Sequence, residues 1–327
     1  MSCVNFTNEE PWILIENISY FWYDYVAFVL IVIAIVGNSF VILIQSRLGG
    51  ARVGGKSANR LIIGLAVADL LTAFFYIPLP EYVNVPPTTA GEFYCRVIEP
   101  KSLAWVCFMA SVYTLTTISI ERYLAIAYPY SYRTWAKHGY EKFAFSLIWL
   151  AAVLINLFTF LFGDMDECGR CLFNFPSLRS RKVFGVFLFI FEYFGPLCIM
   201  SYTNLQSILK LRQYSLGLHV ASKATLSQDA QAIHRRLTTM FTVIFVTFFV
   251  LWTPDQICFL VYNLGVLSDN FTKTVAYKVL VKAAFVNACT MNPFIYSVWV
   301  PSFRRQATAY LTCRGIGNIY LTDTDTR

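Results

Sequence analysis

Charged residues are scarce in this chain. Only 14% of its 327 residues are Asp, Glu, Lys or Arg, and 57% are hydrophobic, whereas charged residues make up about 25% of a typical soluble domain. This composition excludes an ordinary soluble globular domain. We therefore interpret the chain as one whose main solvent is the lipid bilayer.

Histidine is scarce as well, and enzyme motifs are missing. The three histidines, His138, His219 and His234, lack the spacing of metal ligands. The chain has neither a glycine loop that would cradle phosphate nor the sharp turn of a hydrolase nucleophile. We predict that the protein is not an enzyme and uses no cofactor and no catalytic metal. The net charge of +7 needs no nucleic-acid partner, because basic residues on the cytoplasmic side of a membrane protein account for most of it.

Long apolar runs dominate the rest of the chain. We expect no cleavable signal peptide, because Met1–Tyr20 carries Asn, Glu and Pro where an apolar core should be. Seven apolar stretches are each long enough to cross about 30 Å of hydrocarbon as a helix. These stretches are Tyr25–Gln45, Ala58–Leu79, Val97–Ala125, Lys142–Phe162, Val183–Leu211, Leu237–Val261 and Val275–Val300.

The basic residues predict how the chain crosses the membrane. They gather in the loops after spans one and three and before span six, which places those loops in the cytoplasm. The protein is then a multi-pass plasma-membrane protein with an extracellular N-terminus and lipid as a partner. The Asn-x-Ser/Thr acceptors for glycosylation all fall outside in this topology. They are Asn5, Asn17 and Asn270.

The predicted fold class is an all-α membrane protein, a seven-transmembrane helix bundle with a short amphipathic C-terminal helix. Residues 1–24 form an extracellular tail, 25–300 the transmembrane domain, and 301–327 the amphipathic helix and a short cytoplasmic tail. The segment Ser302–Leu311 mixes aromatic and aliphatic residues with arginines, as a helix on the inner leaflet would. Cys313 at its end is a palmitoylation candidate, with an unmodified cysteine as the alternative.

Polar residues inside the spans mark positions of interest. Asp69 lies in span two, where a carboxylate costs about 2.5–3.5 kcal/mol to insert and needs partners. Ser111 precedes Arg122 by eleven residues, about three helical turns, so both lie on one face of span three. Pro254 interrupts an inward stripe in span six and predicts a hinge below Trp252.

These residues together resemble the rhodopsin-like (class A) G-protein-coupled receptors from about Tyr25 to Cys313. Each span carries one of the family's motifs, in order. They are Gly37–Asn38, Leu65–Ala66–Val67–Ala68–Asp69, Glu121–Arg122–Tyr123 with Ile126, Pro129 and Tyr132, Trp149, Pro196, Trp252–Thr253–Pro254, and Asn292–Pro293–Phe294–Ile295–Tyr296 followed by Phe303.

The resemblance implies a receptor that passes an extracellular signal to a heterotrimeric G protein by outward movement of helix six. It assigns the coupling switch to Glu121, Arg122, Tyr123, Asn292, Pro293 and Tyr296. It assigns signal transmission to Phe248, Trp252 and Pro254. It also implies a polar core that in the family can hold a sodium ion, formed by Asn38, Asp69, Ser111 and Asn292.

Four outer cysteines, an even number in an oxidising compartment, predict disulfides. They are Cys3, Cys95, Cys168 and Cys171. The resemblance makes Cys95 one partner of a bond to Cys171 or Cys168, with the remaining cysteine left for Cys3. Cys95 lies two residues farther from Arg122 than the family pattern has it, so we expect a bulge or a longer turn near Pro100.

Other departures from the family pattern concern the residues that support the coupling switch. Asn204 stands where the family usually has a Tyr that supports the active state, and Ala288 stands where it usually has an Asn, which weakens the expectation of sodium. His234 replaces an acid that some members place opposite the motif arginine. In the resting state Arg122 is then held mainly by Glu121, and we expect raised basal signalling.

Two residues that mark particular ligand classes in the family are missing from this chain, so the resemblance disfavours those classes as ligands. The acid of amine receptors is absent from span three, where the two possible registers give Ala104 or Ser102, and Val286 stands at the lysine position of retinal receptors. The candidate pocket carries both signs of charge, which favours a peptide, or else a small zwitterion. An internal ion pair between Asp255 and Lys282 is an equally weighted alternative. The pocket residues are Trp105, Glu192, Asp255, Gln256, Lys278 and Lys282.

The competing interpretation is a seven-helix transporter or ion pump. Asp69, Glu192, Asp255 and Lys282 could form a polar path through the bundle. The chain lacks the internal repeats of such transporters, and a polar path gives no reason for the Glu121–Arg122–Tyr123 and Asn292–Tyr296 motifs to occur together.

Overall fold

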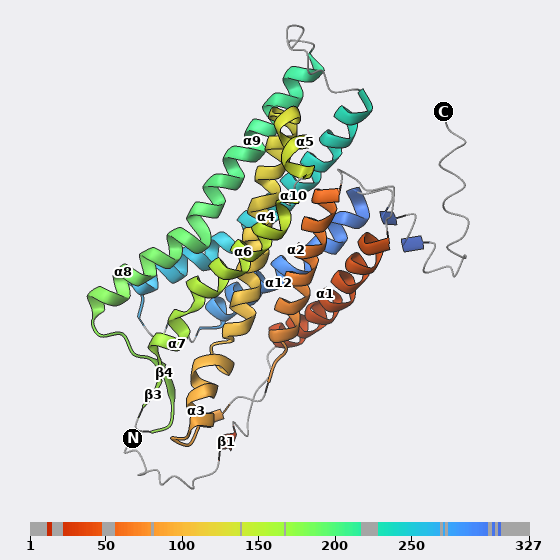
Figure 1. The fold of residues 1–327 in the computed structure, drawn as a ribbon. Helices are drawn as coiled ribbons and strands as arrows, with labels where there is room; N and C mark the ends of the chain where they lie inside the picture. The colour runs from red at the N-terminus through yellow and green to blue at the C-terminus, as the bar shows by residue number, and fades with distance from the viewer. Residues whose placement is uncertain are drawn as a thin grey trace.

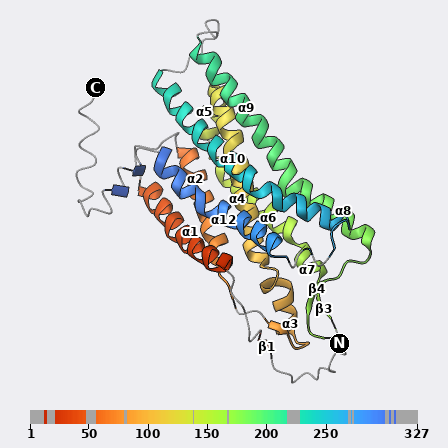
Figure 2. The same ribbon diagram turned by 180° about the vertical axis from the view of Figure 1, so that it is seen from behind.

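The computed structural model describes residues 12–14, 22–47, 56–79, 82–137, 139–166, 168–216, 228–268, 271, 274–299, 303–304 and 307–308. Long helices run side by side through most of this part of the chain (Figures 1 and 2). Helices are the expected form because the interior of a bilayer offers backbone N–H and C=O groups no water, so each span must satisfy its own hydrogen bonds.

Six helical spans in the described residues are long and apolar enough to cross a membrane. The seventh, α12 (Val275–Trp299), consists of two segments, Val275–Phe285 and Cys289–Trp299, that meet at 45°. The other spans are α1 (Trp22–Arg47), α2 (Lys56–Phe75), α3 (Thr89–Phe93) with η1 (Tyr94–Ile98) and α4 (Ser102–Ala127), α6 (Glu141–Asn156) with α7 (Phe158–Phe162), α8 (Leu178–Leu188) with η2 (Phe189–Phe194) and α9 (Gly195–Ser215), and α10 (Gln228–Asn263).

The predicted seven-helix bundle is confirmed, and one span end is corrected. The second apolar stretch was expected to reach Leu79, but α2 ends at Phe75 and the chain turns at Tyr76 and Ile77. Pro78 follows within three residues of the helix end, and the residue before a proline is disfavoured in helical conformation. The short C-terminal helix is present at Phe303–Arg304 and Ala307–Thr308, and Phe303 is buried with its ring centroid 6.3 Å from that of Phe40.

The two ends of the bundle differ in their connections. At one end, β1 (Ile13–Leu14) pairs with β2 (Tyr82–Asn84), and β3 (Gly163–Met165) pairs with β4 (Cys171–Phe173), both antiparallel. We call this the hairpin end. The opposite end carries α5 (Pro129–Lys137), which directly follows α4 (Figure 1). We call it the Arg122 end, since Arg122 lies near the last turns of α4.

The α4 helix lies in the middle of the bundle and packs against α2, α6 and α9 (Figure 2). Close approach of α1 and α12 depends on Gly37, because a Cβ there would lie 3.0 Å from the Cβ of Pro293. Small residues of this kind let helix backbones approach in membrane bundles, where packing replaces the hydrophobic effect as the driving force.

The expected irregularity near Pro100 is present. Tyr94–Ile98 forms a turn of π-helix, and Lys101 has a left-handed backbone with φ of 55° before α4 begins. A π-helix takes more residues per turn than an α-helix, so this turn accommodates extra chain between Cys95 and Arg122.

Several predicted modification sites lie outside the described residues. These are the glycosylation acceptors and the cysteines at the two chain ends, namely Asn5, Asn17, Asn270, Cys3 and Cys313.

Candidate functional site

A cavity of about 970 Å³ opens at the hairpin end, between η2, α8, α10, α12 and the β3–β4 hairpin. Its walls include several aromatic side chains, and its polar groups include acids and one arginine. The lining residues that matter below are Trp105, Arg181, Glu192, Asp255, Gln256, Phe259, Tyr262 and Tyr277. Four of the six predicted pocket residues therefore line one cavity.

The β3–β4 hairpin forms an outer wall of this cavity through Leu172 and Phe173. A disulfide between Cys95 and Cys171 ties the hairpin to η1, which selects Cys171 from the two predicted partners. Cys168 is disulfide-bonded too, and its predicted partner, Cys3, lies outside the described residues.

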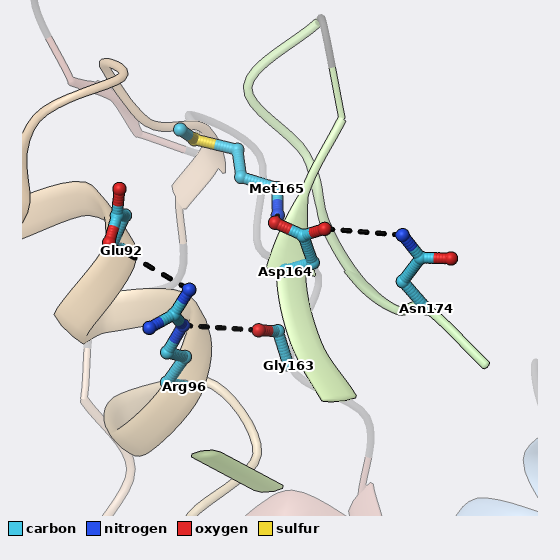
Figure 3. Close-up of polar contacts among 6 residues, drawn as sticks. All are labelled: Glu92, Arg96, Gly163, Asp164, Met165 and Asn174. Atoms are coloured by element: carbon cyan, nitrogen blue, oxygen red, sulfur yellow. Dashed lines mark hydrogen bonds and ion pairs between the residues drawn. The ribbon is translucent and has the colours of Figure 1, made fainter. Parts of the chain in front are cut away.

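Polar contacts hold the same hairpin in place (Figure 3). Arg96 on η1 donates from Nε to the carbonyl oxygen of Gly163 at 3.1 Å, and Asn174 donates to Asp164 at 3.3 Å. The backbone N–H of Met165 also donates to Asp164, and these bonds hold the pKa of that carboxyl below its usual range. The hairpin is therefore fixed to η1 covalently and by hydrogen bonds.

Two buried acids lie in the cavity. Glu192 comes from η2 and Asp255 from α10, and they are 5% and 3% exposed. Gln256 Nε2 donates to Asp255 Oδ2 at 3.3 Å. Both acids line the same cavity, so the structure brings into one site two residues that are 63 positions apart in the sequence.

The two predicted pocket lysines are not among the residues that line this cavity. Lys282 forms an ion pair with Asp24 of α1, with its ammonium 5.3 Å from the ring centroid of Tyr23. Lys278 is exposed. The alternative of an Asp255–Lys282 ion pair is thus wrong, because α12 presents Lys282 to α1 while Asp255 faces the cavity from α10.

An aromatic cluster lies around Trp252. Its ring centroid is 4.9 Å from that of Phe108, 4.8 Å from that of Phe248 and 5.5 Å from that of Tyr193. Tyr193 and Thr253 share a hydrogen bond of 2.5 Å between their hydroxyls, which joins η2 to α10. We did not predict Phe108 or Tyr193. Phe108 precedes Ser111 by one helical turn, so the inward face of span three could have indicated it.

The predicted polar core, Asn38, Asp69, Ser111 and Asn292, is buried inside the bundle. Ser111 donates to Asp69 Oδ1 at 2.5 Å, and Asn292 donates from Nδ2 to Asp69 Oδ2 at 2.7 Å. Asn38 instead donates to the backbone oxygens of Cys289 at 2.6 Å and Ala34 at 2.9 Å. Asp69, Ser111 and Asn292 therefore form one contact group, and Asn38 braces α12 separately.

A sodium ion would need oxygen ligands around Asp69, because hard cations bind oxygen. Asn292 turns a nitrogen donor to that carboxylate, and both carboxylate oxygens accept hydrogen bonds from the protein. The arrangement therefore does not present a set of oxygen ligands for sodium around Asp69.

At the other end, Arg122 and Glu121 are both buried and form an ion pair of 2.8 Å. Tyr132 of α5 donates to the second oxygen of Glu121 at 2.6 Å, and burial together with that carboxylate raises the pKa of the Tyr132 phenol, so it stays a donor at neutral pH. Nε and Nη1 of Arg122 have no hydrogen-bond partner among the described residues. His234 of α10 lies within electrostatic reach of the guanidinium.

The structure also gives the surroundings of other residues that the sequence linked to the switch. Asn204 donates to Ser119 at 3.3 Å and to the backbone of Met200 at 2.9 Å. The Tyr123 ring lies 6.2 Å from that of Tyr202. Tyr296 is fully buried, and its hydroxyl has no hydrogen-bond partner among the described residues.

Comparison with known proteins agrees with this geometry. The family described as 7 transmembrane receptor (rhodopsin family) matches residues 37–296, which is most of the chain and every motif from Gly37 to Tyr296. The chain belongs to this family of receptors, as the motifs predicted.

Individual receptors of known name share 25–27% sequence identity with this chain. The chain is 27% identical to an allatostatin-A receptor of Bombyx mori, over 84% of this chain and 74% of that protein. It is 27% identical to galanin receptor 2a of Danio rerio, over 83% and 72% of the two chains. It is 25% identical to somatostatin receptor type 5 of Rattus norvegicus, over 85% and 74%.

Proposed function

We propose that this plasma-membrane receptor binds a peptide-type ligand in the cavity at the hairpin end and activates a heterotrimeric G protein at the Arg122 end. The observation that carries the proposal is the 970 Å³ cavity. Sites for small molecules span about 300–1,000 Å³, so this one is large enough for several peptide side chains. The named relatives, receptors for allatostatin A, galanin and somatostatin, support the same ligand class.

The hairpin end faces the outside of the cell in this proposal. Disulfides persist in oxidising compartments and are rare in the cytosol, and the Cys95–Cys171 bond is at this end. The basic loops predicted to be cytoplasmic then lie at the Arg122 end. As in the rest of its family, the role of the chain is reception of a signal rather than catalysis.

Transmission starts at the cavity floor. A ligand that contacts the residues around Glu192 and Asp255 presses on the Tyr193–Thr253 bond and on the rings packed against Trp252. Pro254 removes one backbone hydrogen bond of α10 and so provides the flexible point in that helix. The ligand prefers the state in which the Arg122 end of α10 has moved outward, and binding shifts the population to that state.

Outward movement of α10 exposes Arg122 to the G protein. In the present structure the guanidinium is held by Glu121 alone, and two of its nitrogens have no hydrogen-bond partner among the described residues. A buried cation with unused donors is readily re-paired when a new acceptor arrives. Backbone carbonyls at the C-terminus of a G-protein helix would supply such acceptors.

The experiment is a screen of short peptides, small zwitterions and amines on cells that express the full chain, with G-protein dissociation as the readout. Peptide responses that disappear in the Arg122→Ala variant would support the proposal. A response to amines or zwitterions with none to peptides would reject the ligand class. Ligand-free ion flux without any G-protein response would favour a transporter instead.

A further inference from the structure

We infer that the ligand carries a cationic group, a guanidinium or an ammonium, which binds between Glu192 and Asp255. The inference rests on the proposed function, because it names the chemistry that the same cavity selects. It depends on four features of the cavity: the burial of the two acids, their lack of a basic partner, the position of the arginine that shares the cavity, and the aromatic walls.

Both acids are buried, yet the described residues supply no ion pair to either. Asp255 accepts a hydrogen bond from the neutral amide of Gln256, and Glu192 has no hydrogen bond or ion pair among the described residues. Removing a carboxylate from water without a charged partner is unfavourable, and two such groups that face one cavity disfavour each other's charged form. A cation between them removes both penalties at once.

The basic residues nearby are already engaged. Arg181 lies in the same cavity, but its guanidinium carbon is 4.2 Å from the ring centroid of Tyr262, and it donates to the backbone oxygen of that residue at 3.3 Å. Lys282 is paired with Asp24 on the far side of α12. The cation that compensates the two acids must therefore come from outside this part of the chain.

The walls suit a cation as well. Trp105, Phe259 and Tyr277 line the cavity with the two acids, and aromatic faces attract ammonium and guanidinium groups. A guanidinium can also donate to two carboxylates at once through its planar fork. The side chain of an arginine, the side chain of a lysine or the N-terminal amine of a peptide would supply the group.

The consequence for signalling follows from where the acids are attached. Glu192 is next to Tyr193 in sequence, and Asp255 is two residues after Thr253, so the acids are carried by the same two segments that the hydroxyl bond joins. A cation held between the acids pulls these two segments together. That movement acts directly on Trp252, whose ring packs against Tyr193.

The first test uses small probes on the purified full-length receptor. Argininamide should raise its melting temperature, and citrullinamide, which has a neutral urea of nearly the same shape, should not. The Glu192→Gln and Asp255→Asn variants should lose the effect, whereas Glu92→Gln, a change at an exposed acid on α3 outside the cavity, should keep it. Equal stabilisation by both probes would overturn the inference.

The second test needs no ligand. Glu192→Gln removes an uncompensated charge, so it should leave the melting temperature of the unliganded receptor unchanged or raise it. Asp69→Asn, which disturbs an acid with two donors of its own, should lower it. If Glu192→Gln lowers the melting temperature as much as Asp69→Asn does, Glu192 has a structural partner and the inference is wrong.

The third test separates this inference from the proposed function. Cells expressing the receptor are given two matched peptide libraries, one with arginine and one with citrulline at each position. A response to the arginine set that falls at least about thirtyfold in the Glu192→Gln variant supports the inference, since removing one member of a buried charge pair costs at least that much in affinity. Equal responses to both sets would reject the cation while the peptide receptor stands. No response to either set would count against the peptide, and the two stability tests would still decide for or against the cation site.

Discussion

The buried acids of the bundle fall into two groups, those with partners from the chain and those without a charged partner among the described residues. Asp69 accepts hydrogen bonds from Ser111 and Asn292, and Glu121 is paired with Arg122 and bonded by Tyr132. Glu192 and Asp255 are as deeply buried but have no charged partner in the described residues. The partnered acids hold the bundle in one arrangement, and the unpartnered acids are left for a ligand.

This difference matters because burial of a charge is tolerated only when something compensates it. Where the chain supplies a partner, replacing the acid or its partner should lower the stability of the receptor or disturb the regulation of its signalling. Where the chain supplies none, removal should cost only ligand recognition. Substitutions at each kind of position test this division.

Arg122→Ala should abolish G-protein activation and leave ligand binding largely intact, because Arg122 is at the opposite end of the bundle from the cavity. Receptor-catalysed nucleotide exchange and ligand binding measured on the same membranes check this. Lys142→Ala, at an exposed position on α6, should change neither. Loss of both binding and activation at normal surface expression would contradict the role assigned to Arg122.

Asp69→Ala should lower the stability of the unliganded receptor, because it leaves the buried donors of Ser111 and Asn292 without their acceptor. Each unsatisfied buried group costs about 1–3 kcal/mol. Thermal unfolding of the purified receptor measures the loss. Ser111→Ala removes only one of the two bonds and should cost less, so a larger loss for Ser111→Ala would show that the carboxylate is not the centre of the group.

His234→Glu should reduce ligand-independent signalling, because a carboxylate within reach of Arg122 adds a second partner that holds Arg122 in the resting state. A gain of about 1.4 kcal/mol for the resting state would lower basal activity tenfold. G-protein dissociation without ligand, at matched surface expression, is the measurement, and His234→Gln is the neutral control. A wild-type receptor that is silent without ligand would refute the expected raised basal signalling.

Lys282→Ala should have the smallest effect. Its ion pair with Asp24 is partly exposed, with side chains 28% and 21% accessible, and such pairs contribute about 1 kcal/mol or less. Asp24→Ala should cost the same, and the double variant should cost no more than either single change. Ligand potency should stay within about threefold. A large loss of potency would show that Lys282 contributes to ligand binding.

The sequence predicted most of the fold and only part of the site. Span positions followed from apolar length, and Ser111 was placed on the same face of span three as Arg122 because helical periodicity fixes which residues share a face. The family resemblance grouped Ser111 with Asp69. The two predicted pocket lysines are not among the residues that line the cavity, because counting residues along α12 does not say how that helix is rotated relative to α1 and α10. Nothing in the pattern near Glu192 indicated the π-helical turn of η2 that carries it.

By itself, the amino-acid sequence determined that this protein is a membrane bundle of the rhodopsin family, since the length of an apolar run and the order of motifs are properties of the linear chain. Only the tertiary structure decided that Cys171 pairs with Cys95, that Lys282 pairs with Asp24, and that Glu192 and Asp255 meet in one cavity. Those contacts depend on helix rotation and packing, because side chains distant in sequence become neighbours only when the helices have associated.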